Sequence, residues 1–170
     1  MGIRFETGGV SLRVTERAHY ALRMMTVLAR HYPERELVNL RIIAEEERLP
    51  HPFLEQLTMP LRHAGLVHSV RGVKGGYILG RDPSEISLYD IVVATDGPIA
   101  PVDCLAPQYV EGSCPMDNHC VTASVWGDLQ HVIVAFLQSK TLEYIAESSP
   151  IRRVPLGTIA LLPDTQVNAS

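Results

Sequence analysis

The spacing of apolar residues in the N-terminal third of the chain is the strongest constraint on its fold. Apolar side chains recur there at intervals of three and four residues, which is the period of amphipathic helices. Thr15 can cap a first helix that runs to about His31, and Asn39 can cap a second helix from Leu40 to about Glu46. This part of the chain is therefore predicted to be helical.

A third helix is predicted to begin near Pro52 and to stop at Gly65, because proline suits a first helical position and glycine the position after the last turn. Pro60 is expected to kink this helix or to end its regular part early, since it lacks a backbone N–H. The second and third helices, joined by a tight turn, form a helix-turn-helix, whose second member can lie in the major groove of DNA.

A β-hairpin is predicted directly after the third helix. Leu66–Val70 and Tyr77–Leu79 are typical of strands, and Arg71–Gly76 forms a glycine-rich turn between them. The turn lacks the spacing of a P-loop, which excludes a nucleotide site of that kind. The predicted fold is mainly α with a small β-hairpin wing, that is, a winged helix-turn-helix domain followed by a long dimerisation helix.

Charge is distributed unevenly along the chain. Residues 1–81 carry twelve Lys and Arg against eight Asp and Glu, a net of +4, whereas residues 82–170 carry three against eleven, a net of −8. No acidic side chain occurs from Gln56 to Arg81. A positive patch in an acidic protein is typical of selective phosphate contact, and a solvated basic face is the alternative interpretation.

The third helix and the wing supply the candidate DNA contacts. Glu55 could accept a hydrogen bond from a cytosine amino group, and Gln56 could pair with adenine, although both could also be ordinary exposed residues. Arg71 and Lys74 lie where a wing contacts phosphates or the minor groove, and glycines permit close backbone approach. The candidate DNA-binding residues are Arg13, His51, Glu55, Gln56, Arg71, Lys74 and Gly75.

Cys104, Cys114 and Cys120 are the only cysteines of the chain and lie in one polar stretch with glycine and prolines. An odd number of cysteines fits poorly with a disulfide framework. Clustered thiolates on a loop suit a soft metal centre, with solvent-accessible redox thiols or chance clustering as alternatives. Both gaps are wider than those of common zinc sites, so we expect an iron–sulfur cluster, 2Fe–2S or 4Fe–4S, with a fourth ligand from elsewhere.

A long amphipathic helix is predicted from Val121 to Ser139. Its heptad positions are apolar: Val125, Leu129, Val132 and Phe136. Such a seam can pair with a second copy of the chain, and packing on its own domain is the alternative. Pairing would give a homodimer with two DNA-reading heads on pseudo-palindromic half-sites about one DNA turn apart.

These patterns divide the 170 residues into three parts. Residues 12–82 are expected to form the winged helix-turn-helix DNA-binding domain, residues 83–148 the cluster-binding loop and dimerisation helix, and residues 149–170 a C-terminal tail. Short helices are expected after Ser87 and across Thr141–Ala146. The chain lacks the long apolar run of a membrane span and the apolar region of a signal peptide, so with three free thiols we expect a cytoplasmic protein without a membrane partner.

Several short motifs together resemble the IscR/NsrR group of winged-helix transcription regulators, over about Leu12 to Ser148. The matching segments are Leu12–Thr15, Tyr20–Leu22, Phe53–Leu57, Leu61–Arg62, Ala64–Val67, Ser69–Gly72, Gly75–Tyr77, Ile86–Ser87, Thr95–Asp96 and the helix with Trp126. The resemblance implies that the three cysteines hold an iron–sulfur cluster in a homodimer whose DNA affinity follows the cluster state. It also implies that Arg71 is the wing arginine and Glu55 the recognition-helix glutamate.

The chain departs from this group around the fourth cluster ligand. IscR-like members place a histidine three residues after the last cysteine, where this chain has Ala123. NsrR-like members use an aspartate of the partner subunit, and His19 stands at the corresponding position. His19 of the partner subunit is therefore the candidate fourth ligand, and Asp103, Asp117 and His119 are its rivals.

The sequence thus predicts a cytoplasmic, homodimeric transcription regulator, a repressor and not an enzyme, that is controlled by an iron–sulfur cluster. Its candidate signals are iron–sulfur supply, iron, redox stress and nitric oxide. The alternative is a small iron–sulfur or thiol redox protein without DNA binding. That alternative leaves the winged helix unexplained, and the chain has no C-x-x-C pair.

Overall fold

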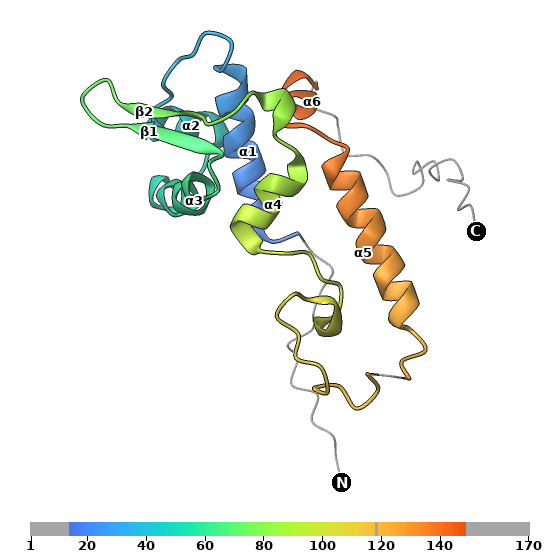
Figure 1. Ribbon diagram of the computed structural model, residues 1–170. Helices are drawn as coiled ribbons and strands as arrows, with labels where there is room; N and C mark the ends of the chain where they lie inside the picture. The colour runs from blue at the N-terminus through green and yellow to red at the C-terminus, as the bar shows by residue number, and fades with distance from the viewer. Residues whose placement is uncertain (1–13, 118, 149–170) are drawn as a thin grey trace.

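The computed structural model describes residues 14–117 and 119–148, which form six α-helices and one two-stranded sheet (Figure 1). The helices are α1 Glu16–Arg30, α2 Leu40–Glu47, α3 His51–His63, α4 Leu88–Asp96, α5 Ala123–Gln138 and α6 Leu142–Glu147. The strands are β1 Val67–Val70 and β2 Gly76–Leu79, and two short 3-10 turns, η1 Pro83–Glu85 and η2 Asp103–Leu105, lie in the connections.

The helix caps predicted from the sequence are confirmed. The Thr15 side chain accepts from the backbone N–H of Ala18 at 3.2 Å, and the Asn39 side chain accepts from that of Arg41 at 2.9 Å. Gly65 follows α3 with a φ of +68°, a left-handed conformation that glycine adopts at low cost. The three N-terminal helices accordingly begin and end within one or two residues of the predicted positions.

The prediction that Pro60 ends the regular part of α3 early is wrong. The helix continues through Pro60 to His63, and the Pro60 carbonyl accepts from the N–H of Ala64 at 3.0 Å. Leu57 and Leu61, on either side of the proline, are both buried in the core. Their burial keeps the last turn helical, although Pro60 has no N–H to donate.

The core is built around α1. Its residues Met24, Met25 and Leu28 have at most 1% of their surface exposed. They share one apolar cluster with side chains from every surrounding element, including Ile43, Leu54, Leu57, Leu61, Leu66, Ile86, Ile91 and Leu142. Helices α2 and α3, the hairpin, α4 and α6 therefore all pack on a single helix.

The wing is an antiparallel hairpin in which Val67 pairs with Leu79 and Val70 with Gly76. Val38 extends this pairing, because it exchanges two backbone hydrogen bonds of 2.9 Å with Tyr77. The hairpin is thus attached by its second strand to the segment that precedes α2.

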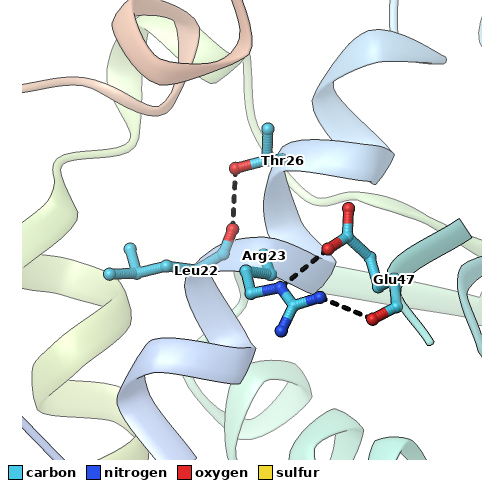
Figure 2. Close-up of polar contacts among 4 residues, drawn as sticks. All are labelled: Leu22, Arg23, Thr26 and Glu47. Carbon is cyan, nitrogen blue, oxygen red and sulfur yellow. Dashed lines mark hydrogen bonds and ion pairs between the residues drawn. The ribbon is translucent and has the colours of Figure 1, made fainter. Parts of the chain in front are cut away.

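An ion pair joins α1 to the end of α2 (Figure 2). The Arg23 Nε lies 2.7 Å from a Glu47 carboxylate oxygen, and its Nη2 donates to the Glu47 backbone carbonyl at 2.5 Å. The carbonyls at the end of a helix have no partner within the helix. Arg23 satisfies one of them and so helps to set the angle between α1 and the helix-turn-helix.

The C-terminal helices return to the same core. Ser87 and Asp90 form a capping box at the start of α4, as the predicted helix start requires. Leu88 donates to the Lys140 carbonyl and Leu142 to the Ile86 carbonyl, each at 2.8 Å, which joins the start of α6 to the start of α4. Helix α6 also packs against α1. Helix α5 lies on the outside of the molecule, and the described residues include no helix that is both long and apolar enough to cross a membrane (Figure 1).

Replacement of Met24 by alanine should lower the free energy of unfolding by about 2–5 kcal/mol, because a fully buried side chain leaves a cavity. Met59→Ala is the matched control, since Met59 is 60% exposed on α3. Urea unfolding at one protein concentration measures both. Equal losses of stability in the two variants would contradict the placement of the core around α1.

Candidate nucleic-acid interface and cysteine loop

Helix α3 presents three polar side chains on its exposed side. His51, Glu55 and Gln56 are all exposed, whereas Leu54 and Leu57 between them are buried. The His51 Nδ1 lies 3.6 Å from a Glu55 carboxylate oxygen, one helical turn away. The buried residues hold the helix on the core, so its polar side is free to meet a ligand.

The wing faces this side of α3 across a shared hollow of about 390 Å³. Arg71 and Lys74 are exposed on the turn. The polar and glycine residues that line the hollow include His51, Glu55, Arg62, Ser69, Arg71 and Gly75. Among the predicted DNA-binding residues, His51, Glu55, Arg71 and Gly75 are therefore brought together, and Arg13 lies outside the described residues.

Gly75 has a structural reason to be glycine. A Cβ at this position would lie 2.3 Å from the Val70 carbonyl oxygen and 2.8 Å from that of Gly72. Gly72 itself has a φ of +124°, which side chains rarely adopt. These glycines let the turn fold tightly and so place Arg71 beside α3.

Arg62 lines the hollow but is absent from the predicted set of contacts. Its signal in the sequence is the acid-free stretch from Gln56 to Arg81. It lies near the end of α3, where a basic side chain also offsets the helix dipole. Helical spacing alone does not indicate that this arginine reaches the wing.

The three cysteines are free thiols in the segment between α4 and α5. Cys104 is exposed, and Cys114 and Cys120 are partly exposed. Cys104 and Cys114 line a common hollow of about 570 Å³, and Cys120 is not among its lining residues. Within residues 14–117 and 119–148, no three His, Cys, Asp or Glu side chains gather closely enough to hold a metal ion.

Local hydrogen bonds hold this segment at separate points. The Gln130 side chain of α5 donates to the Ile99 carbonyl at 2.7 Å and to the Leu105 carbonyl at 3.4 Å, on either side of Cys104. The Cys120 sulfur lies 3.4 Å from the Thr122 hydroxyl, and this hydrogen bond lowers the pKa of the Cys120 thiol. A lowered pKa favours the thiolate, which is the form that binds metals.

A second network surrounds Cys114. The Tyr109 hydroxyl donates to Asp117 and accepts from the Cys114 backbone N–H at 3.0 Å. The other Asp117 oxygen accepts from the Gly112 N–H at 2.5 Å. The hydrogen bond to Asp117 raises the pKa of Tyr109 to about 12. Neither Tyr109 nor this role of Asp117 is apparent from the sequence pattern.

His19 is exposed on the first turns of α1. The Thr15 hydroxyl, one turn earlier, donates to Asp96 at 2.6 Å, which ties the start of α1 to the end of α4. The His19 ring lies 5.3 Å from that of Tyr20, which in turn meets Phe53 of α3 edge-on at 5.4 Å. The start of α1, which carries His19, thus contacts the end of α4 through Thr15 and contacts α3 through Tyr20.

The heptad seam of α5 lies on an open surface of the protomer. Val125, Val132 and Phe136 are 60%, 54% and 49% exposed, and the helix has no fully buried residue. Packing on its own domain, the alternative use of this seam, therefore leaves most of it uncovered in a single chain. A row of exposed apolar side chains is typical of an interaction surface.

Comparison with known proteins shows the family to which this chain belongs. Residues 14–148 match Rrf2, the iron-dependent transcriptional regulators. The chain belongs to the Rrf2 family. It is 35% identical over 135 residues to the HTH-type transcriptional regulator CymR of Bacillus subtilis, covering 79% of this chain and 90% of CymR. It is 37% identical over 140 residues to the HTH-type transcriptional regulator IscR of Photorhabdus laumondii, covering 82% of each.

Solved structures agree with this assignment. CymR, the global cysteine regulator of Bacillus subtilis, aligns with a TM-score of 0.64 at 35% identity, over 80% of this chain and 97% of CymR. IscR of T. potens aligns with a TM-score of 0.62 at 40% identity, over 79% of this chain and 86% of that protein. The predicted resemblance and fold class are confirmed. This Rrf2 protein is a DNA-binding transcription regulator, and its named relatives are regulators and not enzymes.

Proposed function

We propose that this Rrf2 protein is a homodimeric repressor whose affinity for a promoter operator is controlled by an iron–sulfur cluster. The observation that carries the proposal is the set of three free thiols, Cys104, Cys114 and Cys120, in the one segment that connects α4 to α5. The match to a family of iron-dependent regulators supports it.

The donor set fits the chemistry of an iron–sulfur cluster. Three thiols are soft ligands, and the pKa of Cys120 is already lowered by its hydrogen bond to Thr122. Cys104, Cys114 and Cys120 would hold the cluster, with His19 of the partner subunit as the fourth ligand. When bound, such a cluster supplies a redox- and iron-dependent state that can respond to iron–sulfur supply, iron, redox stress or nitric oxide.

The exposed surfaces of α5, α3 and the wing support a dimer that binds DNA. The α5 seam would pair with that of a second copy, and the two copies would present α3 and the wing to successive half-sites of duplex DNA. Residues 12–82 would then read DNA and residues 83–148 would hold the cluster and the dimer together. Arg71 and Lys74 would contact phosphates or the minor groove, while Glu55 and Gln56 would read bases.

Helix α1 would connect cluster binding to DNA binding. Its first turn is tied to α4 through Thr15 and Asp96, and its middle is tied to α2 through Arg23 and Glu47. Tyr20 packs edge-on against Phe53 of the recognition helix. Movement of α1 at His19 would therefore be passed to α3, and DNA affinity would change by the free-energy difference between the two arrangements, about 1–3 kcal/mol.

A second candidate function is regulation by thiols or cysteine without a cluster. The similarity to CymR, the global cysteine regulator, favours this candidate. So does the separation of the three cysteines, since no metal-holding group of side chains is assembled within the described ranges. Both candidate functions include DNA binding, so a DNA-binding assay does not separate them. Iron and sulfide analysis of anaerobically purified protein does, because only the first function requires a cluster.

The cofactor is tested by replacing each cysteine. Protein purified without oxygen should be brown, and Cys104→Ala, Cys114→Ala or Cys120→Ala should each remove or strongly reduce the visible absorption, since each thiolate is a ligand. Ser124→Ala is the control, because it removes an exposed hydroxyl close to Cys120 in the sequence but no thiol. Colourless wild-type protein with one zinc per chain would reject the cluster.

The DNA interface is tested by paired substitutions. Arg71→Ala should weaken binding to all sequences and reduce the slope of affinity against salt by about one unit if Arg71 contacts a phosphate. Glu55→Ala should relax sequence preference more than it weakens overall binding, since a base contact carries specificity.

Arg30→Ala is the control, because Arg30 is exposed on α1 and does not line the hollow between α3 and the wing. Fluorescence anisotropy on operator and unrelated duplexes at several salt concentrations measures all three variants. If Arg71→Ala behaves as Arg30→Ala does, Arg71 lies outside the interface.

The fourth ligand is tested with two exposed histidines. His19→Ala should change the visible spectrum, shorten the lifetime of the cluster in air and reduce the dependence of DNA binding on the cluster. His119→Ala, inside the cysteine segment, should leave all three properties as in the wild type. The reverse pattern would assign the ligand to His119 and leave α1 without a direct link to the cluster.

A further inference from the structure

We propose that Tyr109 and Asp117 are positioning residues that fold the segment from 109 to 117 into a closed turn around Cys114 before any cluster is bound. In this arrangement Asp117 is a structural partner of Tyr109 and not the fourth ligand. The inference deepens the proposed function and rests on it only where the cluster is concerned, because the turn itself is a property of the protein without a metal.

The turn is closed by contacts from both ends. Tyr109, at its start, donates its hydroxyl to Asp117, at its end, and the same hydroxyl accepts from the Cys114 backbone N–H at 3.0 Å. The second Asp117 oxygen accepts from the Gly112 N–H at 2.5 Å. The Asp117 backbone N–H adds a bond of 3.1 Å to the Cys114 carbonyl. Both ends of the turn and both backbone groups of Cys114 are thereby held.

The glycine in the turn supports the same interpretation. Gly112 has a φ of +88°, the left-handed region in which a side chain is strained. This conformation lets the Gly112 N–H point at the Asp117 carboxylate. Hydrogen bonds to a carboxylate are charge-assisted and stronger than neutral ones. The Asp117 side chain therefore joins the end of the turn to both Tyr109 and Gly112.

Both carboxylate oxygens of Asp117 have hydrogen-bond partners in this arrangement. Coordination of iron by Asp117 would have to break at least one of these bonds and release the turn. Among the described residues, the other candidate ligands of the segment, Asp103 and His119, form no hydrogen bond with Tyr109. The geometry thus removes Asp117 from the set of candidate ligands and gives it a different task.

The benefit of the closed turn is that Cys114 is ordered in advance. A flexible loop loses conformational freedom when it closes on a ligand, and a segment that is already folded avoids part of this loss. Tyr109 bonds directly to the backbone of Cys114 and of neither other cysteine. Loss of the network should therefore affect Cys114 more than Cys104, which lies outside the turn.

The test compares Tyr109→Phe and Asp117→Asn with Glu111→Gln, a matched control that neutralises an exposed carboxylate in the same turn. The readout on the cluster-free, reduced, full-length protein is the rate of alkylation of each cysteine by iodoacetamide, followed by mass spectrometry. Both test variants should speed alkylation of Cys114 relative to Cys104 by about threefold to tenfold, the factor that corresponds to one net hydrogen bond. Glu111→Gln should leave the ratio unchanged.

Cluster-loaded protein gives a second readout. Tyr109→Phe and Asp117→Asn should shorten the lifetime of the cluster in air to a similar extent without changing the shape of its visible spectrum. The double variant should be no worse than either single variant, since both substitutions break one network.

Two results would overturn the proposal. One is a Cys114-to-Cys104 alkylation ratio that stays at the wild-type value in both test variants. The other is a changed visible spectrum in Asp117→Asn alone, which would make Asp117 a ligand. A protein that carries no cluster would refute the proposed function instead, and the alkylation ratios would still decide whether the turn exists.

Discussion

Burial of α1 on several sides is the constraint on which the other elements depend. Met24, Met25 and Leu28 are almost completely removed from water, because the neighbouring helices pack on α1 from several sides. The helix-turn-helix is held by this packing and by the Arg23–Glu47 pair, while α4 and α6 contact α1 from other directions (Figure 1). Helix α1 therefore contacts both α3 and the end of α4, where the cysteine segment begins.

The cysteine segment depends on a different kind of interaction. Among its described residues from 97 to 122, none is fully buried, so no apolar core stabilises it. Its shape rests on a few polar contacts, those of Gln130 near Cys104 and those of Tyr109 and Asp117 around Cys114. Segments with few buried contacts rearrange at low cost. The well-packed DNA-binding domain is thus joined to a loop that few contacts hold. In such an arrangement, a ligand bound at the loop can alter the packing of the domain.

Much of the fold could be predicted from the sequence because the signals are local. Thr15, Asn39 and Ser87 cap the helices they were expected to cap, and the glycine-rich turn lies between paired strands. Of the two effects expected of Pro60, an early end of the regular helix does not occur, because burial of Leu57 and Leu61 outweighs a missing backbone donor. Arg62 and Tyr109 could not be identified as site residues, since their partners lie on other segments whose approach depends on the folded loops.

The helix-turn-helix, the wing, the heptad seam of α5 and the grouping of three thiols in one segment could be predicted from the amino-acid sequence, because each follows from short-range spacing or residue chemistry. Which side chains meet depends on the folded chain. It placed Arg71 and Arg62 on one hollow with Glu55, tied the start of α1 to α4 through Thr15, and engaged both oxygens of Asp117. These contacts depend on how the chain packs around α1 and closes its loops, which no local pattern encodes.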